Sequence, residues 1–252
     1  MELSNAQIIE LFHIAFLDVL SRRFDKTRYT LKGGANLRYF FDSIRYSEDI
    51  DLDLNGPAPW SMVEKVDKVL DSATLDAILR VAGISIAEAT TPKQTETTRR
   101  WKLGLAIEGR EELVRTKIEF SGRDREEGLF AVEAVPQRIV APYGLRTPLV
   151  QHYLGESMSE QKVLALARRS HVQARDVFDL DLLLRRYALS GEAAIAAEDI
   201  EAAIGHALEL PFDAFRDQVL PFLEPEVAAD YEDPETWAAM QTFVAGELEE
   251  AR

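Results

Sequence analysis

Three aspartates alternate with apolar residues in the segment DIDLD, residues 49–53. If this segment is a strand, its side chains point alternately to opposite faces, so the three carboxylates share one face. Aspartate is uncommon in strands, and like charges on one face repel unless a cation lies between them. The outer strand of a sheet with a solvated face is one explanation. A metal site is the better one, because Mg²⁺ binds carboxylate oxygens and keeps positions for substrate phosphates.

A short strand, a glycine pair and a short helix are predicted just before this segment. The strand is predicted at residues 29–31, the turn at Gly33 and Gly34, and the helix at residues 35–41. Glycine lets the backbone approach a ligand closely, and a helix start directs free N–H groups at one point, which suits a phosphate. A tight connection without a ligand would use the same residues, and the spacing matches neither common glycine-rich phosphate motif.

Four motifs follow one another along the chain: KGG at 32–34, RYSEDID at 45–51, SEQKVLALARR at 159–169 and RDVFDL at 175–180. Together they resemble the nucleotidyltransferase toxins of the AbiEii and MenT type, which belong to the polymerase-β-like nucleotidyltransferase superfamily. One difference is Ala35, at a position where the family often has a hydroxyl residue. This difference removes a side-chain contact to phosphate but leaves the backbone contacts of the glycine pair.

The resemblance implies which carboxylates would bind metal. Asp49 and Asp51 would hold the Mg²⁺ or Mn²⁺ ions that transfer from an NTP requires. Glu119 would be the third acidic member, on a strand beside them. The alternative is that Glu119 and Lys117 simply face solvent at the edge of a strand.

It also implies which residues would contact the nucleotide in the first lobe. The N–H groups of Gly33 and Gly34 would bind the triphosphate, and the hydroxyl of Ser47 would donate a hydrogen bond to a phosphate oxygen. Lys32 lies at the start of the same turn, where it would contact phosphate or point to solvent.

Two residues of the second lobe complete the implied site. Lys162 would contact the triphosphate as a point charge. Asp176 would orient Lys162 or the acceptor, or accept the proton of the nucleophile. Arg175 and Asp179 would alternatively form structural ion pairs.

Composition excludes several other classes of protein. The chain has no cysteine, which excludes disulfides and thiolate metal sites. The apolar run 8–20 contains Glu10, His13 and Asp18, so it is neither a signal peptide nor a membrane span. We therefore expect a cytoplasmic protein with no membrane partner.

Charge is distributed unevenly along the chain, whose net charge is −15. Residues 190–252 contain 16 of the 44 acidic residues and two of the 29 basic ones, so the remainder is close to neutral. Basic residues cluster there at 22–28, 99–102, 168–169 and 185–186. Such clusters either form an RNA-facing side or are solvated faces of helices and strands.

The pattern of elements predicts an α+β fold. Residues 1–150 would form a polymerase-β-like nucleotidyltransferase lobe, with a mixed sheet flanked by helices, and residues 151–252 a mostly helical lobe with an acidic C-terminal region. In the first lobe, Asn5 would cap the first helix, and a long helix 60–81 would follow a break at Gly56 and Pro57. Three further strands are expected at 84–89, 99–107 and 113–121, and five later helices at 159–169, 175–187, 193–208, 212–220 and 234–249.

The function implied by the resemblance is that of a magnesium-dependent toxin. Such a protein belongs to a bacterial toxin–antitoxin or phage-defence (abortive infection) system, has a cognate antitoxin, and transfers nucleotides from an NTP to RNA, with tRNA 3′ ends as the expected acceptor. Two alternatives remain. The acceptor could be a protein hydroxyl, or the chain could be a non-catalytic nucleotide-binding module.

Overall fold

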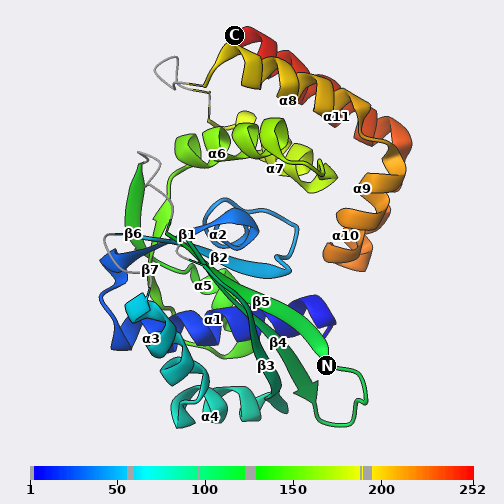
Figure 1. Ribbon diagram of the computed structural model, residues 1–252. Coiled ribbons are helices and arrows are strands. Elements are labelled where there is room, and N and C mark those ends of the chain that lie inside the picture. The colour runs from blue at the N-terminus through cyan, green and yellow to red at the C-terminus, as the bar shows by residue number, and fades with distance from the viewer. Residues whose placement is uncertain (1–2, 56–59, 96, 123–128, 188, 190–194) are drawn as a thin grey trace. The chain divides into compact units, whose positions relative to one another are not determined.

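The computed structural model describes residues 3–55, 60–95, 97–122, 129–187, 189 and 195–252 (Figure 1). The predicted break at Gly56 and Pro57 and the predicted helix start at Ala193 lie outside them. The chain divides into two compact units. Unit 1 comprises Met1–Phe40 and Tyr46–Tyr153, and unit 2 comprises Phe41–Arg45 and Leu154–Arg252.

Unit 1 is built on one seven-stranded sheet in the order β3-β4-β5-β2-β1-β7-β6. Two of its strand pairs, β1 with β7 and β2 with β5, are parallel and the others are antiparallel. The prediction of an α+β fold with a mixed sheet is therefore confirmed. The strands are β1 (Tyr29–Lys32), β2 (Asp49–Leu54), β3 (Ile84–Gln94), β4 (Thr98–Ile107), β5 (Val114–Ser121), β6 (Phe130–Ala134) and β7 (Leu149–Tyr153).

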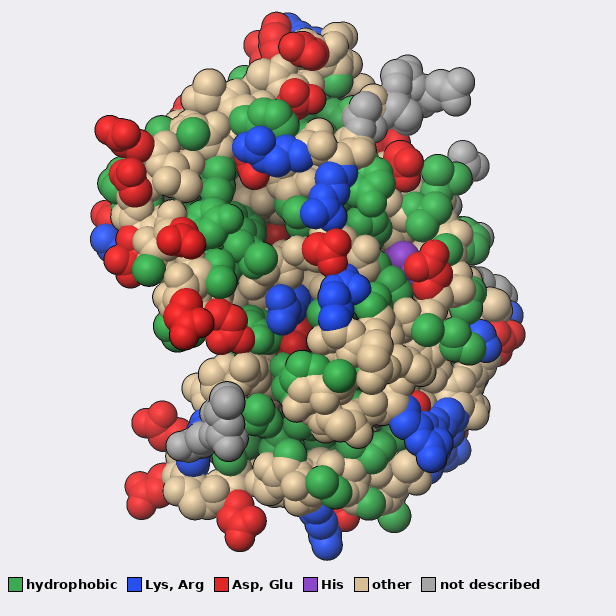
Figure 2. Space-filling view, turned by 180° about the vertical axis from the view of Figure 1, so that it is seen from behind, with side chains coloured by type: hydrophobic (Ala, Val, Ile, Leu, Met, Phe, Trp, Pro, Cys, Tyr) green, Lys and Arg blue, Asp and Glu red, His purple; other side chains and the backbone are tan. Residues whose placement is uncertain are grey.

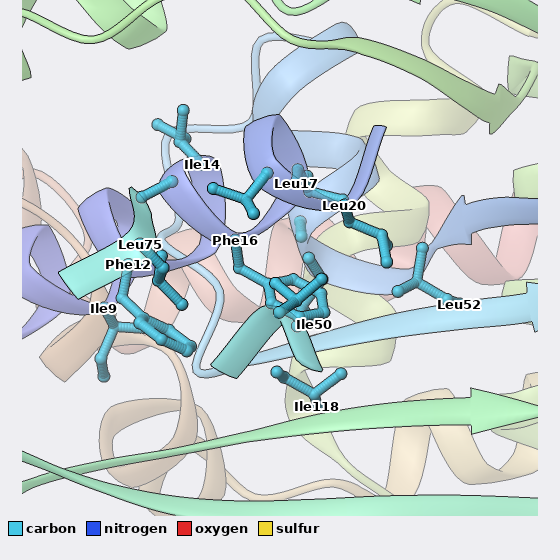
Figure 3. Packing of buried hydrophobic residues seen from close by; sticks show 14 of the residues in the cluster. Ile9, Phe12, Ile14, Phe16, Leu17, Leu20, Ile50, Leu52, Leu75 and Ile118 are labelled. Carbon is cyan, nitrogen blue, oxygen red and sulfur yellow. The ribbon is translucent and has the colours of Figure 1, made fainter. Parts of the chain in front are cut away.

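Helix α1 (Asn5–Arg23) provides much of the core of unit 1, and every residue from Ile8 to Leu20 is buried. Figure 3 shows its Phe16 side chain directed towards Ile50 and Ile118 of the sheet. Burial of these apolar side chains is the main force that holds the helix on the sheet. The other helices of unit 1 are η1 (Lys26–Arg28), α2 (Gly33–Phe40), α3 (Trp60–Leu70), α4 (Ala73–Val81), α5 (Gln137–Val140) and η2 (Ala141–Tyr143).

Two local predictions were wrong because serine side chains set the helix starts. Ser4, not Asn5, caps α1: its hydroxyl accepts from the N–H of Gln7, whose side chain accepts in return from the Ser4 N–H. The expected helix 60–81 is two helices, α3 and α4. Ser72 separates them, because its hydroxyl accepts from the N–H of Leu75 and donates to the carbonyl of Val69.

Unit 2 is helical apart from its connections. Its helices are α6 (Gly155–Arg168), α7 (Ala174–Leu184), α8 (Ala197–Glu209), α9 (Phe212–Gln218), η3 (Leu220–Phe222), α10 (Pro225–Ala229) and α11 (Pro234–Glu250). They enclose a second apolar core, in which Phe215 stacks on Trp237 with ring centroids 4.7 Å apart. In the described part of the chain, no helix is both long enough and apolar enough to cross a membrane.

Aromatic packing in unit 2 requires a glycine at the start of α6. The ring of Tyr187 lies so close to Gly155 that a Cβ added there would come within 2.5 Å of it. The same ring meets Phe41 edge to face at 5.6 Å, and Arg186 donates a hydrogen bond to the Phe41 carbonyl. These contacts fix the Phe41–Arg45 segment to the rest of unit 2.

We predict that Gly155→Ala lowers the free energy of unfolding by about 1–3 kcal/mol, because the new methyl group must displace the Tyr187 ring. Gly205→Ala in α8 is the matched control. A Cβ at Gly205 meets nothing within 4 Å, so this change should stabilise the helix by roughly 0.5–1 kcal/mol. Denaturant unfolding of both variants measures the difference, and equal stabilities would refute the packing argument.

Candidate active site

The three aspartates of β2 share one face of the sheet, as the alternation predicts. Burial alternates along the strand: Ile50 and Leu52 are fully buried, whereas Asp49, Asp51 and Asp53 are half-buried. Helix α1 covers the apolar side (Figure 3). The sheet therefore holds three carboxylates a strand repeat apart, on the face opposite its main core.

The glycine turn lies against the middle carboxylate. Gly33 has a φ of +68°, which glycine adopts without steric cost, and it begins helix α2 directly after β1. A Cβ on Gly33 would lie only 3.0 Å from Oδ2 of Asp51. Because the first N–H groups of a helix have no partner within the helix, Gly33 and Gly34 provide donors next to this carboxylate.

Strand β5 runs parallel to β2 and brings both a base and an acid to the aspartates. Lys117 pairs in register with Asp49, and its Nζ lies 2.5 Å from Asp49 Oδ2. Glu119 pairs in register with Asp51. Its carboxylate, however, contacts Arg100 of β4 at 2.5 Å.

The remaining contacts at this face surround Asp53 and Asp49. Lys32 forms an ion pair with Asp53, whose Oδ2 also accepts a hydrogen bond of 3.0 Å from the Tyr153 hydroxyl. The hydroxyl of Ser47 donates to the Asp49 carbonyl at 2.7 Å. In this structure Lys32 and Ser47 thus stabilise the two ends of the acidic strand.

Asp51 is the carboxylate for which the fold provides the fewest partners. No hydrogen bond or ion pair reaches it from any described residue. Burial and the negative charge of Asp49 raise the pKa of its carboxyl, while Lys117 and Lys32 oppose the shift. A divalent cation would favour the ionised form of Asp51 and remove its repulsion from Asp49.

The donor set fits a hard cation with two protein carboxylates. Mg²⁺ prefers oxygen ligands and typically takes one or two carboxylates together with substrate phosphates. Asp49 and Asp51 are two carboxylates on one strand face that could serve in this way. Among the described residues, no three His, Asp or Glu side chains gather closely enough to hold a metal. The role of Glu119 as a third ligand stays a prediction, and it would require release of Glu119 from Arg100.

Lys162 and Asp176, the two site residues predicted in unit 2, lie together in a buried ion-pair network. Nζ of Lys162 is 2.9 Å from Asp176 Oδ1 and 2.6 Å from Asp179 Oδ2. Both aspartates are fully buried and the lysine side chain is 9% exposed. Arg169 lies 3.0 Å from the second oxygen of Asp176, but without hydrogen-bond geometry. Asp176 and Lys162 are thus in direct contact, while the orienting role of Asp176 stays a prediction.

Arg45 is a member of this network that the sequence reasoning did not identify. It lies in the Phe41–Arg45 segment of unit 2, and its guanidinium contacts Asp179 at 2.9 Å. Burial opposes ionisation of Asp179, but Arg45 and Lys162 outweigh it and hold the pKa of this carboxyl below its usual value. Arg45 is the first residue of the RYSEDID motif, and this position could have indicated a role for it. The resemblance, however, assigned roles in this motif only to Ser47 and the aspartates.

Comparison with known proteins identifies the family of the chain. The sequence model of the AbiEii nucleotidyl transferase toxins, which are part of type IV toxin–antitoxin systems, matches residues 15–250. The chain belongs to this AbiEii family. It is therefore a nucleotidyltransferase of a toxin–antitoxin system, which implies a nucleotide substrate and an antitoxin.

Two solved structures from Helicobacter pylori resemble the AbiEii chain over nearly its whole length. The structure of JHP933 has 19% sequence identity and a TM-score of 0.57, and the match covers 99% of this chain and 96% of that one. The structure of a candidate nucleotidyltransferase has 18% identity and a TM-score of 0.56, with coverage of 97% and 96%. At these identities the similarity shows a shared fold. No curated protein sequence matches the chain.

For this AbiEii protein we predict that Asp51→Asn raises the midpoint of thermal unfolding at neutral pH when a chelator is present. A carboxyl with a raised folded-state pKa stabilises the fold only while it is protonated, and that contribution is lost as the pH rises through the pKa. The gain should therefore shrink as the pH is lowered. Asp53→Asn is the control: it weakens the contacts to Lys32 and Tyr153 and should destabilise. Equal shifts for both variants would contradict the prediction.

We further predict that Arg45→Met destabilises the AbiEii chain by about 3 kcal/mol, because it leaves the buried Asp179 with one cation instead of two. Arg216→Met is the control in the same unit. Its side chain is 53% exposed and pairs with the exposed Asp213, so its loss should cost less than about 1 kcal/mol. Urea unfolding compares them, and a loss for Arg45→Met no greater than the control would exclude a structural role for Arg45.

Proposed function

We propose that the chain is a magnesium-dependent nucleotidyltransferase toxin, as in the AbiEii and MenT type, that transfers a nucleotide from an NTP to RNA, with tRNA 3′ ends as the acceptor. One observation supports this most strongly. Asp51 is a desolvated carboxylate without a partner among the described residues, next to Asp49 and to the N–H groups of the glycine turn. This is a suitable place for a metal-bound triphosphate.

The proposed metal ligands are Asp49 and Asp51. When bound there, Mg²⁺ or Mn²⁺ would neutralise the triphosphate and align the attacking hydroxyl with the phosphorus. Both carboxylates must be ionised to bind the metal, so activity should fall on acidification as Asp51 takes up a proton. Because the pKa of Asp51 is raised, this loss should begin at a higher pH than for an ordinary aspartate.

The residues around the metal ligands would bind the nucleotide. Gly33 and Gly34 would donate N–H hydrogen bonds to phosphate oxygens, since they lie at the start of α2. Lys117 neutralises Asp49 in this structure and would exchange that contact for the phosphates when the metal binds. Lys162, oriented by Asp176, would contribute positive charge towards the triphosphate.

The proposed cellular role is supported by membership of a toxin–antitoxin family. A toxin that blocks the 3′ ends of tRNA would stop translation, and its antitoxin would allow growth when the system is silent. Phage defence by abortive infection would use the same activity, since arrest of the host also arrests the phage. The protein would act in the cytoplasm, where NTPs and tRNA are found.

The test is incubation of the purified protein with Mg²⁺, total tRNA and each labelled NTP in turn. We predict label in RNA and an increase in tRNA mass by the added nucleotide. Asp49→Ala and Asp51→Asn should each reduce the rate by more than roughly 100-fold, the upper limit for loss of an outer-shell metal partner. Lys68→Ala changes an exposed side chain and should keep full activity.

Four results would contradict the proposal. The RNA could remain unlabelled with every NTP, or the Asp49→Ala variant could label it as well as the wild type does. Label that survives RNase treatment of a cell lysate would instead point to a protein acceptor. Growth inhibition that persists in Asp51→Asn would indicate a non-catalytic nucleotide-binding module.

A further inference from the structure

A groove on unit 1 has a basic half and an apolar half. The basic half has a volume of about 640 Å³ and is lined by residues that include Arg22, Lys26 and Arg146. The apolar half, of about 350 Å³, adjoins it, and both halves share Asp18, Arg22, Leu145 and Arg146. The two halves therefore form one continuous depression beside the C-terminal end of α1.

The basic half carries positive charge that unit 1 does not fully neutralise. Arg22 pairs with Asp18 at 2.6 Å, yet its side chain remains 44% exposed. Neither Lys26 nor Arg146 forms an ion pair with a described residue. On a chain with a net charge of −15, this is a local excess of positive charge. Figure 2, which is turned by 180° from Figure 1, shows Lys and Arg side chains gathered at the right of the view; this corresponds to the left of Figure 1, where α1 ends.

The apolar half offers a surface for a flat, uncharged group. Ile78 and Val81 of α4 line it together with Ile14 of α1, and Val81 is 91% exposed. Tyr143 also lines it, while its hydroxyl is held by Glu10 at 2.7 Å, which fixes the ring. A volume of about 350 Å³ is at the lower end of the range for pockets that bind small ligands, and a nucleobase is a ligand of this kind.

The position of the groove determines how long its ligand must be. Lys26 precedes β1, whereas Lys32, which pairs with Asp51, is the last residue of β1 and Gly33 follows it. The groove therefore lies at the opposite end of this strand from the acidic site. Leu149, at the start of the parallel strand β7, also lines the groove. Four strand residues span roughly 13 Å. A ligand at both places must be longer than one nucleotide.

We propose that this groove binds a single-stranded segment of the RNA acceptor. One base enters the apolar half, and the adjacent phosphates contact Arg22, Lys26 and Arg146. This rests on the proposed RNA acceptor, and it adds an RNA-binding surface separate from the metal and nucleotide site. The cations of the basic half suit the phosphates of such a strand, and the adjoining apolar half suits one of its bases. Phosphate contacts supply affinity, and stacking of the base adds to it.

The test of the basic half measures RNA binding apart from catalysis. A short single-stranded RNA is titrated by fluorescence anisotropy in chelator, with Asp51→Asn as the parent protein. We predict that Lys26→Ala combined with Arg146→Ala weakens binding about tenfold at moderate salt, and that the slope of log affinity against log salt becomes shallower by about 0.7 for each lost phosphate contact. Lys68→Ala, 70% exposed and outside the groove, should bind like the parent.

A second pair of variants tests the apolar half. Val81→Glu should weaken RNA binding because it places a negative charge at the rim of the pocket, whereas Val81→Lys, equally polar, should not. Both changes are at an exposed position, and thermal unfolding confirms that each variant is folded. Inorganic polyphosphate, which has the charge of RNA without bases, should compete less well than RNA at equal phosphate concentration.

Several results would overturn the assignment. The first is unchanged RNA binding by the variant that combines Lys26→Ala with Arg146→Ala. The second is a loss of binding in Lys68→Ala as large as in that variant. The third is competition by polyphosphate, or by an acidic peptide such as polyglutamate, that is as strong as competition by RNA. Failure of the proposed function is recognised separately. If the wild type transfers no nucleotide to RNA but groove-dependent RNA binding persists, the enzymatic proposal fails and the binding surface stands. If transfer occurs and the groove variants bind and react normally, only the groove assignment fails.

Discussion

The repulsion between Asp49 and Asp51 is the constraint on which the active-site half of the structure depends. Burial of Asp51, together with the negative charge of Asp49 one strand repeat away, raises the pKa of the Asp51 carboxyl, and this costs stability in the absence of a cation. The sheet tolerates the cost because the other face of β2 is fully apolar and lies under α1 (Figure 3). Strong burial on one face of a strand thus permits an unfavourable charge arrangement on the other.

The strand order explains how the charge is distributed at that face. β2 lies between β1 and β5, so cations reach the aspartates from both sides, Lys32 from β1 and Lys117 from β5. Neither reaches Asp51 itself. A sheet with β2 at an edge could supply a cation from one neighbour only. The central position therefore allows two of the three carboxylates to be neutralised, while the third has no cation contact among the described residues.

The residue pattern predicted the parts of the site that depend on periodicity and missed those that depend on tertiary contact. The alternation of residues 49–53 was sufficient to predict the acidic face of β2. The alternation in β4 and β5 was sufficient to predict that both are strands of a sheet. Serine caps at Ser4 and Ser72 were missed because several nearby residues could have served, and only the local backbone selects one. Arg45 was missed for a related reason: its partner Asp179 is 134 residues away along the chain. The short strands β6 and β7 depend on pairing with each other and with β1, which no local pattern shows.

The charge of the chain bears on how such a protein could engage RNA. Residues 190–252 carry most of the net negative charge, which would oppose the approach of a polyanion if charge acted over the whole molecule. At physiological ionic strength, however, exposed charges are screened beyond roughly 8 Å. What an RNA phosphate experiences is then the set of groups within one groove, and in the groove beside α1 three cations face a single carboxylate. Local excess of positive charge, rather than net charge, decides whether an acidic protein can bind RNA, and it restricts binding to the few places where that excess exists.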